Sequence, residues 1–338
     1  MFMPSMRFYS CVIFLLCLST AHAEKGVKVV YPDWFKPSLF DLQGDLQDAR
    51  ESGKRGILLF FSEKSCSYCN AIISTTFKQT DIEKRIRANY DTIGIEVFSD
   101  IELVDTQGKT HWTKDYAVLE KASFTPTMIF YDTAGTKQLR LVGYQSPDKF
   151  RGVLDYLEAG HEKTQSLRQF LQLRGSQYSS NGNTTSSANS DFSHLKDKPL
   201  LAIFESNNCQ KCQQLRSMLK SPVIHSYSQR LTIAFINSDD TTARIVTPTS
   251  QNLSARDWAN QLGLIHSPAL IFFDKQGKEA VRVDTDILVD KNGKDVSDDD
   301  AHIIDNLRAR LQFFLDKGYQ TLPQFQRWRA QQKRRKEK

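Results

Sequence analysis

The chain has 338 residues, of which 40% are apolar and 25% are charged, values typical of a globular protein with room for two cores. Its formal net charge is +6, but residues 327–338 hold seven basic side chains and one acidic one, so this final segment carries as much net charge as the whole chain. The rest of the chain lacks the basic surplus of a nucleic-acid-binding protein, and we expect no nucleic acid among its partners.

Residues 1–23 have the pattern of an export signal that is removed by cleavage. Arg7 supplies a basic start, the apolar stretch Phe8 to Leu18 follows, and Ala21-His22-Ala23 fits the small-residue cleavage rule. The apolar stretch is 11 residues long, which is too short to cross a bilayer as a helix. An uncleaved anchor is the alternative. We expect an exported, periplasmic protein whose mature chain begins at Glu24.

The cysteines that remain after such cleavage fall into two pairs. The signal contains two of the six cysteines, and the other four form Cys66-Ser67-Tyr68-Cys69 and Cys209-Gln210-Lys211-Cys212. Exported proteins commonly use cysteines for structural disulfides at longer spacing, and none is left here for that purpose. The cysteines are therefore expected to serve redox chemistry or metal binding.

In chain order, the first half of the sequence predicts helices that alternate with short apolar strands. The expected helices are Leu39–Ser52, Cys69–Phe77, Trp112–Lys121 and Asp148–Leu157, and the expected strands are Gly56–Phe61, Thr92–Phe98, Thr127–Tyr131 and Gln138–Val142. The last two strands flank a turn at Gly135, which predicts an antiparallel pair. This order predicts an α/β fold with a central mixed sheet flanked by helices.

The second half repeats the first. Each cysteine pair follows an apolar strand, and Thr125–Asp132 is similar to Ser267–Asp274. We therefore expect two domains, at residues 24–172 and 195–326. A flexible linker rich in serine and asparagine is expected at 173–194, and a basic tail at 327–338. The second copy has an acidic insertion at about Asp284 to Asp300.

A strand that leads into Cys-x-x-Cys at the start of a helix favours thiol reactivity. Unpaired backbone N–H groups and the helix dipole favour a negative charge on the first sulfur, which lowers its thiol pKa. The second cysteine lies almost one turn later on the same face, where it can attack a mixed disulfide. Cys66 and Cys209 are therefore the candidate nucleophiles, and Cys69 and Cys212 the candidate resolving thiols.

With these motifs, both halves resemble thioredoxin-fold domains, and the chain resembles exported thiol–disulfide oxidoreductases of that family. The resemblance implies redox-active disulfides and no other cofactor. It also implies that a cis-proline loop beside each cysteine pair binds substrate. These loops correspond here to Thr125-Pro126 and Ser267-Pro268. The implied partners are disulfide-containing or thiol proteins, with a membrane thiol reductase of the Dsb type as electron donor.

The sequence also departs from thioredoxin. The buried aspartate that thioredoxin has six residues before the first cysteine is replaced by Phe60 and Ile203. Glu63 or Glu205 could take over proton transfer, although a carboxylate at such a place can equally be a solvated one. The first copy keeps Gly143 after its hairpin and the second copy has no equivalent glycine, so the redox centre is expected more firmly at Cys66–Cys69.

Other uses of the cysteines remain open. A thiol-protein or copper-binding module could use them without turnover, but copper sites usually add histidine or methionine, and the loop at Cys66 has neither. Zinc ribbons place the second pair roughly 15–20 residues after the first, whereas 143 residues separate Cys66 from Cys209. We expect no metal site, and we favour a protein-disulfide reductase.

Overall fold

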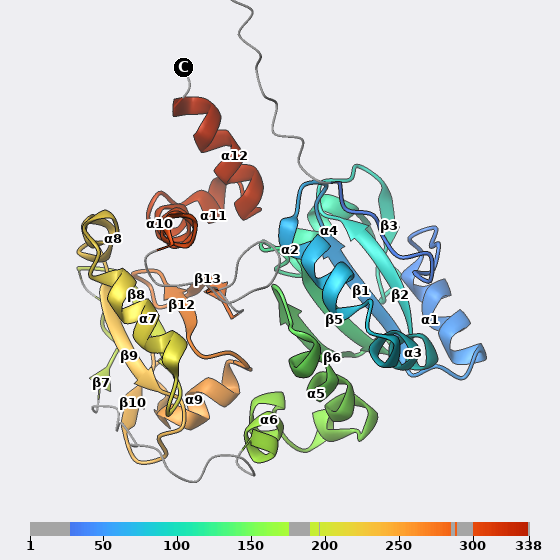
Figure 1. Cartoon of the computed structure of the whole chain (residues 1–338), viewed down its shortest axis with the longest axis horizontal. Helices are drawn as coiled ribbons and strands as arrows, with labels where there is room; N and C mark the ends of the chain where they lie inside the picture. Colours follow the sequence, from blue (N-terminus) through green and yellow to red (C-terminus); the bar gives the residue numbers. More distant parts are fainter. Residues whose placement is uncertain (1–27, 176–189, 196, 285–287, 289–299, 337–338) are drawn as a thin grey trace, which may run out of the picture.

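The computed structural model describes residues 28–175, 190–195, 197–284, 288 and 300–336. These residues form two α/β units that follow one another along the chain (Figure 1). The expected export signal and nearly all of the expected acidic insertion lie outside the described residues.

The first unit is built on a four-stranded sheet in the order β2-β1-β5-β6. Its strands are β1 (Gly56–Ser62), β2 (Tyr90–Glu96), β5 (Thr127–Asp132) and β6 (Lys137–Val142). Strand β1 is parallel to β2 and antiparallel to β5, and β5 is antiparallel to β6. The mixed sheet and the antiparallel pair that the sequence predicts are therefore confirmed.

The helices of this unit cover both faces of the sheet. They are α1 (Leu42–Glu51), α2 (Ser67–Ala71), α3 (Thr80–Asn89), α4 (Thr113–Leu119), α5 (Pro147–Glu158) and α6 (Leu167–Gly175). A π-helical turn at Ile72–Thr76 continues α2, a 3-10 turn at His161–Lys163 precedes α6, and β3 (Glu102–Val104) pairs with β4 (Thr110–Trp112). Sequence analysis missed α3, α6 and the β3–β4 hairpin.

The second unit repeats this architecture with the strand order β13-β12-β8-β9. Its strands are β8 (Leu200–Glu205), β9 (Thr232–Asn237), β12 (Ala269–Phe273) and β13 (Glu279–Val283), and β8 is parallel to β9. A small sheet joins β7 (Ser190–Asp191), β10 (Arg244–Val246) and β11 (Asn252–Ser254). The helices are α7 (Gln210–Leu219), α8 (Pro222–Ser228), α9 (Ala255–Gln261), α10 (Ala301–Leu315), α11 (Gly318–Thr321) and α12 (Phe325–Lys336).

Each central strand is buried on both faces, which explains why it reads as a continuous apolar run. In β1, Leu58 and Phe60 enter the core on one side of the sheet, and Ile57, Leu59 and Phe61 enter the core on the other side. Strand β8 alternates in the same way between two cores. This period-2 packing fixes the register of the strand and with it the position of the cysteines that follow.

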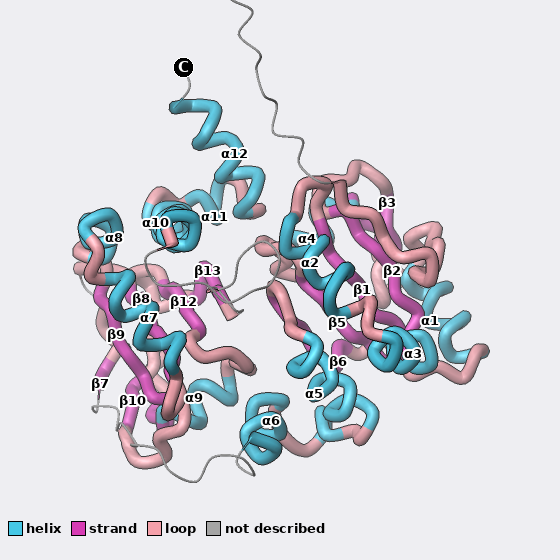
Figure 2. The backbone as a smooth tube through the Cα atoms, in the orientation of Figure 1, coloured by secondary structure: helices cyan, strands magenta, loops and turns pink. Residues whose placement is uncertain are grey.

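The two units also share a core. Phe124 and Val142 of the first unit belong to the apolar cluster formed by α10 and α12 of the second. Figure 2 shows α10, α11 and α12 together at the edge of the second unit, on the side that faces the first. Regular structure extends into both ends of the expected linker at 173–194, since α6 ends at Gly175 and β7 begins at Ser190, and residues 176–189 lie outside the described residues.

Candidate active site

Cys66 lies just beyond the end of β1 and caps the helix that follows. Its Sγ accepts a hydrogen bond from the backbone N–H of Cys69 at 3.0 Å, and the two residues form a disulfide. The exposed fraction is 3% for Cys66 and 0% for Cys69. When the disulfide is reduced, the helix start stabilises a thiolate on Cys66.

Cys209 has the same local geometry in the second unit. It caps α7, its Sγ accepts a hydrogen bond from the backbone N–H of Cys212 at 3.0 Å, and the pair forms a disulfide. Cys212 is buried, but Cys209 is only half-buried. The two sites therefore share their chemistry and differ in access to the nucleophilic sulfur.

A proline loop lies at the same end of the sheet as each cysteine pair. The Thr125–Pro126 and Ser267–Pro268 peptide bonds are cis. Strand pairing aligns the start of β5 with the end of β1, and the start of β12 with the end of β8, so each proline lies beside the strand that leads to the cysteines. In the first unit, Gly143 at φ 79° donates its N–H to the Pro126 carbonyl at 2.6 Å.

The proline loop of the first site is covered by the C-terminal helices. The Phe124 ring lies 5.0 Å from the Phe325 ring and 6.2 Å from the Phe313 ring. The backbone N–H of Phe325 donates to the Ser123 carbonyl at 3.0 Å. As a result Phe124 and Thr125 are only 9% and 7% exposed. A substrate can reach this loop only if that contact opens.

A buried arginine on α10 completes the cover. The Arg310 guanidinium lies 5.3 Å from the centre of the Phe325 ring and 5.9 Å from that of Phe124. Burial lowers the pKa of this guanidinium to about 10.

A carboxyl group that titrates near neutral pH lies next to the first site. Glu63 is buried, its backbone carbonyl accepts the Cys66 N–H at 3.2 Å, and burial together with the charge of Glu96 raises the pKa of Glu63 to about 7. Glu205, the other carboxylate considered from sequence, is instead paired with Arg216 at 2.5 Å. Of the two, Glu63 is the better candidate for proton transfer.

A cavity of about 1110 Å³ lies next to the second site. Asn207, Asn208 and Ser267, the neighbours of Cys209 and Pro268, form one wall of this cavity, and residues of α5 and α6 form the opposite wall. The proline loops of the two sites thus face different surroundings, a packed aromatic cover and an open cavity.

His266, two residues before Pro268, is buried beside the second site. Its backbone N–H donates to Asp284 Oδ1 at 2.9 Å, and its Nδ1 lies 3.3 Å from the same oxygen. Burial raises the pKa of Asp284, but the hydrogen bond and charge of His266 outweigh this and hold that pKa below its usual value. The pair anchors the loop that leads to Pro268.

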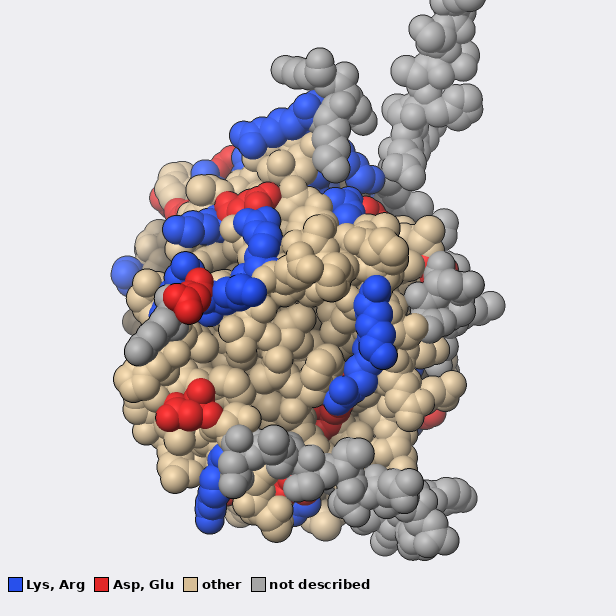
Figure 3. All heavy atoms as spheres, turned by 90° about the vertical axis from the view of Figure 1, so that its left-hand side faces the viewer, with Lys and Arg blue, Asp and Glu red and all other residues tan. Residues whose placement is uncertain are grey.

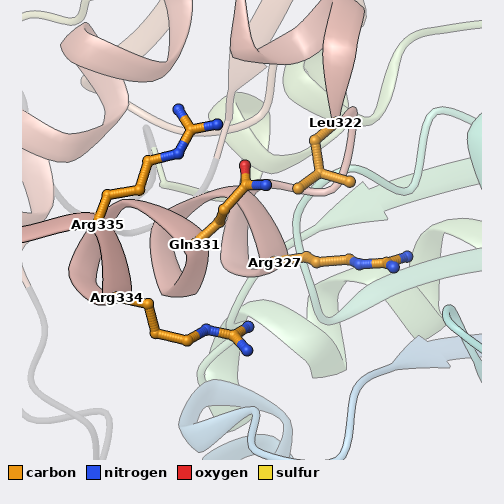
Figure 4. Close-up of a pocket in the computed structure, with 5 residues that line it drawn as sticks. All are labelled: Leu322, Arg327, Gln331, Arg334 and Arg335. Atoms are coloured by element: carbon orange, nitrogen blue, oxygen red, sulfur yellow. The ribbon is translucent and has the colours of Figure 1, made fainter. Parts of the chain in front are cut away.

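The basic C-terminal segment is a helix that starts inside the shared core. Trp328 is 4% exposed, whereas Arg327, Arg334 and Arg335 are exposed and line a cavity of about 350 Å³ (Figure 4). On the face of the molecule shown in Figure 3, most basic side chains lie in the upper and middle parts. Helix α12 therefore combines buried aromatic side chains with exposed arginines.

Two further observations concern the described part of the chain only. It contains no cluster of three or more histidine, cysteine, aspartate or glutamate side chains that could hold a metal ion. None of its helices has the length and apolar character needed to cross a bilayer.

Sequence analysis missed the residues that control access to the sites. Neither the aromatic residues Phe124 and Phe325 nor the arginines Arg168 and Arg310 were singled out from the sequence. The available signal was the position of Phe124, an apolar residue directly before the Thr125-Pro126 motif, where a substrate-binding surface was expected.

Comparison with known proteins agrees with this duplicated architecture. A family model described as thioredoxin-like domain matches the chain twice, at residues 42–158 and 193–295. No curated protein matches the chain.

Among solved structures, a thioredoxin-fold protein from Helicobacter pylori is 18% identical, with a TM-score of 0.31, and the match covers 36% of this chain and 84% of that one. The C-terminal domain of DsbD from Neisseria meningitidis is 15% identical, with a TM-score of 0.25, over 34% of this chain and 91% of that one. The first two thioredoxin domains of Eps1p from Saccharomyces cerevisiae are 11% identical, with a TM-score of 0.23, over 82% of this chain and 97% of that one.

Proposed function

Because the chain belongs to the thioredoxin-like domain family and carries a cysteine pair in each of two such domains, it is a thiol–disulfide oxidoreductase, and we propose that it is an exported protein-disulfide reductase. The domains occupy residues 24–172 and 195–326, with a linker at 173–194 and a basic tail at 327–338. The first 23 residues direct the protein to the periplasm and are removed there.

In the proposed reaction, the thiolate of Cys66 or Cys209 attacks one sulfur of a substrate disulfide. A mixed disulfide forms and the first substrate thiolate leaves. Cys69 or Cys212 then attacks the sulfur of its partner cysteine, which closes the protein disulfide and releases the second substrate thiolate. Two electrons pass from the dithiol to the substrate. Thiol–disulfide exchange with a membrane thiol reductase of the Dsb type restores the dithiol.

The observation that carries this proposal is the hydrogen bond from the second cysteine's backbone N–H to the first cysteine's sulfur, found at 3.0 Å in both domains. It places the nucleophile at a helix start, where thiolate is favoured near neutral pH. Thr125-Pro126 and Ser267-Pro268 lie at the same end of each sheet, and we assign them to binding the substrate backbone.

The test is reduction of a disulfide-bonded model protein by the full mature chain after it has been reduced. We expect the double variant Cys66→Ser, Cys209→Ser to lose at least about 100-fold in rate, since a serine hydroxyl is not ionised at neutral pH. The matched control is Ser217→Ala, at an exposed position on α7, with an unchanged rate. An unchanged rate in the double variant would refute the proposal.

The direction of electron flow is tested by the reduction potential of each pair, measured with the other pair changed to serine. A reductase predicts a value close to about −270 mV, as in thioredoxin, and a value close to about −120 mV would identify an oxidant instead. In the variant Cys69→Ala, Cys212→Ala, the resolving step is blocked, and a trapped mixed disulfide with the model substrate is expected.

A further inference from the structure

The cavity at the second redox site is lined by both domains. Asn207, Asn208 and Ser267 contribute the wall next to Cys209, and α5 and α6 of the first domain contribute the opposite wall. Ser166 Oγ lies 3.2 Å from Asn260 Oδ1, which fixes the start of α6 against α9. The volume of this cavity, about 1110 Å³, is slightly above the range of roughly 300–1,000 Å³ found for pockets that bind small ligands.

Positive charge dominates the lining of this cavity. Three cationic side chains, Lys149, Arg168 and Arg256, line it together with one carboxylate, Asp239. That carboxylate already lies 3.4 Å from Arg168 and accepts the Asn207 backbone N–H at 2.8 Å. A ligand that enters the cavity therefore meets a surplus of positive charge beside Asn207 and Asn208 of the redox loop.

Two of these cations lack part of their hydrogen bonding. The side chain of Arg168 is 4% exposed and donates to Ser238 Oγ, and Arg256 donates to the Asp239 backbone carbonyl at 2.6 Å. Within the described residues, the Nε atoms of both arginines are buried and have no hydrogen-bond partner. Buried donors without acceptors are costly, and carboxylate oxygens are the acceptors that suit guanidinium groups best.

We propose that this cavity binds a small acidic thiol peptide, or its disulfide, with a carboxylate on Arg168 and Arg256 and its sulfur next to Cys209. The inference rests on the thiol–disulfide exchange proposed above and adds its substrate class. Burial lowers the pKa of Arg168, with Asp239 opposing this effect, and a carboxylate ligand relieves the same cost. The first site lacks this environment because aromatic side chains cover its proline loop.

When the ligand is the disulfide form of such a peptide, the reaction consists of two successive thiol–disulfide exchanges. The Cys209 thiolate attacks one ligand sulfur, so that a Cys209–ligand disulfide forms while the ligand's own disulfide breaks and one ligand thiolate leaves. Cys212 then attacks Cys209 Sγ, which forms the protein disulfide and expels the second ligand thiolate. The protein dithiol is oxidised by two electrons and the ligand disulfide is reduced.

The experiment uses the full mature chain with Cys66→Ser and Cys69→Ser, reduced beforehand, so that only the second site reacts. Three probes are compared: glutathione disulfide, which is anionic, bis(2-hydroxyethyl) disulfide, which is neutral, and cystamine, which is cationic. Each rate constant is divided by that of dithiothreitol with the same probe, which removes intrinsic reactivity. We expect glutathione disulfide to exceed cystamine by at least about tenfold, with the difference reduced by 0.5 M salt.

Arg256→Gln is expected to lower the ratio of glutathione disulfide to neutral disulfide by about fivefold or more, since it removes one charge-assisted donor. The matched control Arg230→Gln removes a positive charge from an exposed position outside the cavity and is expected to keep the ratio. Lys149→Gln, at an exposed position on α5, is a second variant in case the first does not fold, and it should lower the ratio by a smaller factor.

The outcomes separate this inference from the proposed function. Failure of all three probes to react would contradict thiol–disulfide exchange at Cys209. Reaction with the neutral probe without any preference for glutathione disulfide would overturn the acidic ligand and leave the exchange reaction in place. An unchanged ratio in both folded cavity variants would also overturn it.

Discussion

The two redox sites share one backbone arrangement and differ in their surroundings. Each first cysteine caps a helix and accepts a backbone hydrogen bond from the second cysteine at 3.0 Å. Yet Cys66 is 3% exposed and lies beside a proline loop covered by the C-terminal helices, whereas Cys209 is half-buried and its neighbour Asn208 lines a cavity. The geometry of the cysteine pair is therefore common to both domains, whereas the packing between the domains sets how accessible each first cysteine is.

This comparison reverses the emphasis suggested by sequence. Gly143 and the Thr125-Pro126 step favoured the first site, and the structure does place Gly143 in contact with the Pro126 carbonyl. However, the same loop is packed against Phe325. We therefore expect the second site to react first with substrates in solution.

The largest expected effect comes from removing the aromatic cover. Phe325 is 0% exposed, so Phe325→Ala should cost about 3–5 kcal/mol in the free energy of unfolding. It should also speed alkylation of reduced Cys66 several-fold, because the contact with Phe124 is lost. The unfolding free energy follows from urea denaturation, and the alkylation rate from mass spectrometry of the trapped cysteine.

The matched control is Phe314→Ala, which removes a buried ring of the same cluster that packs on Phe272 and Tyr319. It should cost a similar free energy without changing the Cys66 rate. Equal acceleration in both variants would mean that lost stability, and not the lost cover, exposes the first site.

The next largest effect concerns Glu63, a residue that has no counterpart in the second domain. Its pKa is raised from 4.5 to about 7 in the folded protein, so the fold binds a proton more tightly than the unfolded chain. Stability from this group is fully present below about pH 4.5, falls as pH rises, and is lost above about pH 7. Glu63→Gln should therefore stabilise the protein at pH 8 by on the order of 3 kcal/mol.

Urea midpoints measured between pH 4 and pH 9 test this expectation. At pH 4 the variant and the native chain should agree, and Glu102→Gln, at an exposed position, should follow the native curve throughout. A Glu63→Gln curve parallel to the native one would contradict a carboxyl that titrates near neutral pH.

A smaller difference is expected between the alkylation rates of Cys66 and Cys209 in the native chain. After reduction, iodoacetamide should label Cys209 about tenfold faster than Cys66, since reagent reaches Cys66 only through local opening of the C-terminal helices. In guanidinium chloride the two rates should become equal. Faster labelling of Cys66 in the folded protein would contradict the expectation that Cys209 is the more accessible nucleophile.

The smallest effect tests a helix cap that only the second domain has. Ser254 accepts the Asp257 backbone N–H at the start of α9, whereas Trp112, at the same place before α4, makes no side-chain cap. Ser254→Ala should cost about 1 kcal/mol, and Trp112→Ser should gain about 0.5 kcal/mol with Asp115 as its partner. Urea denaturation measures both, and a gain from Ser254→Ala would exclude the cap as a stabilising feature.

The fold was predictable because each central strand is buried on both faces and reads as an apolar run. Helix α3 was missed because only Ile82 and Ile86 of its ten residues are buried, so its apolar signal is two side chains. The places of the cysteines and prolines followed from their positions at strand ends. The contact that covers Phe124 could not be predicted, since it joins segments about 200 residues apart. An aromatic residue in the sequence does not indicate which buried cluster it joins.

The hydrogen bond from Phe325 to the Ser123 carbonyl has a consequence for competition. The C-terminal segment is a tethered occupant of the first proline loop, and a tethered group acts at an effective concentration on the order of millimolar. A free substrate must outcompete it, so weak and transient encounters do not reach Cys66. Only a partner that binds the C-terminal helices as well, or that displaces them with a larger surface, gains the first site.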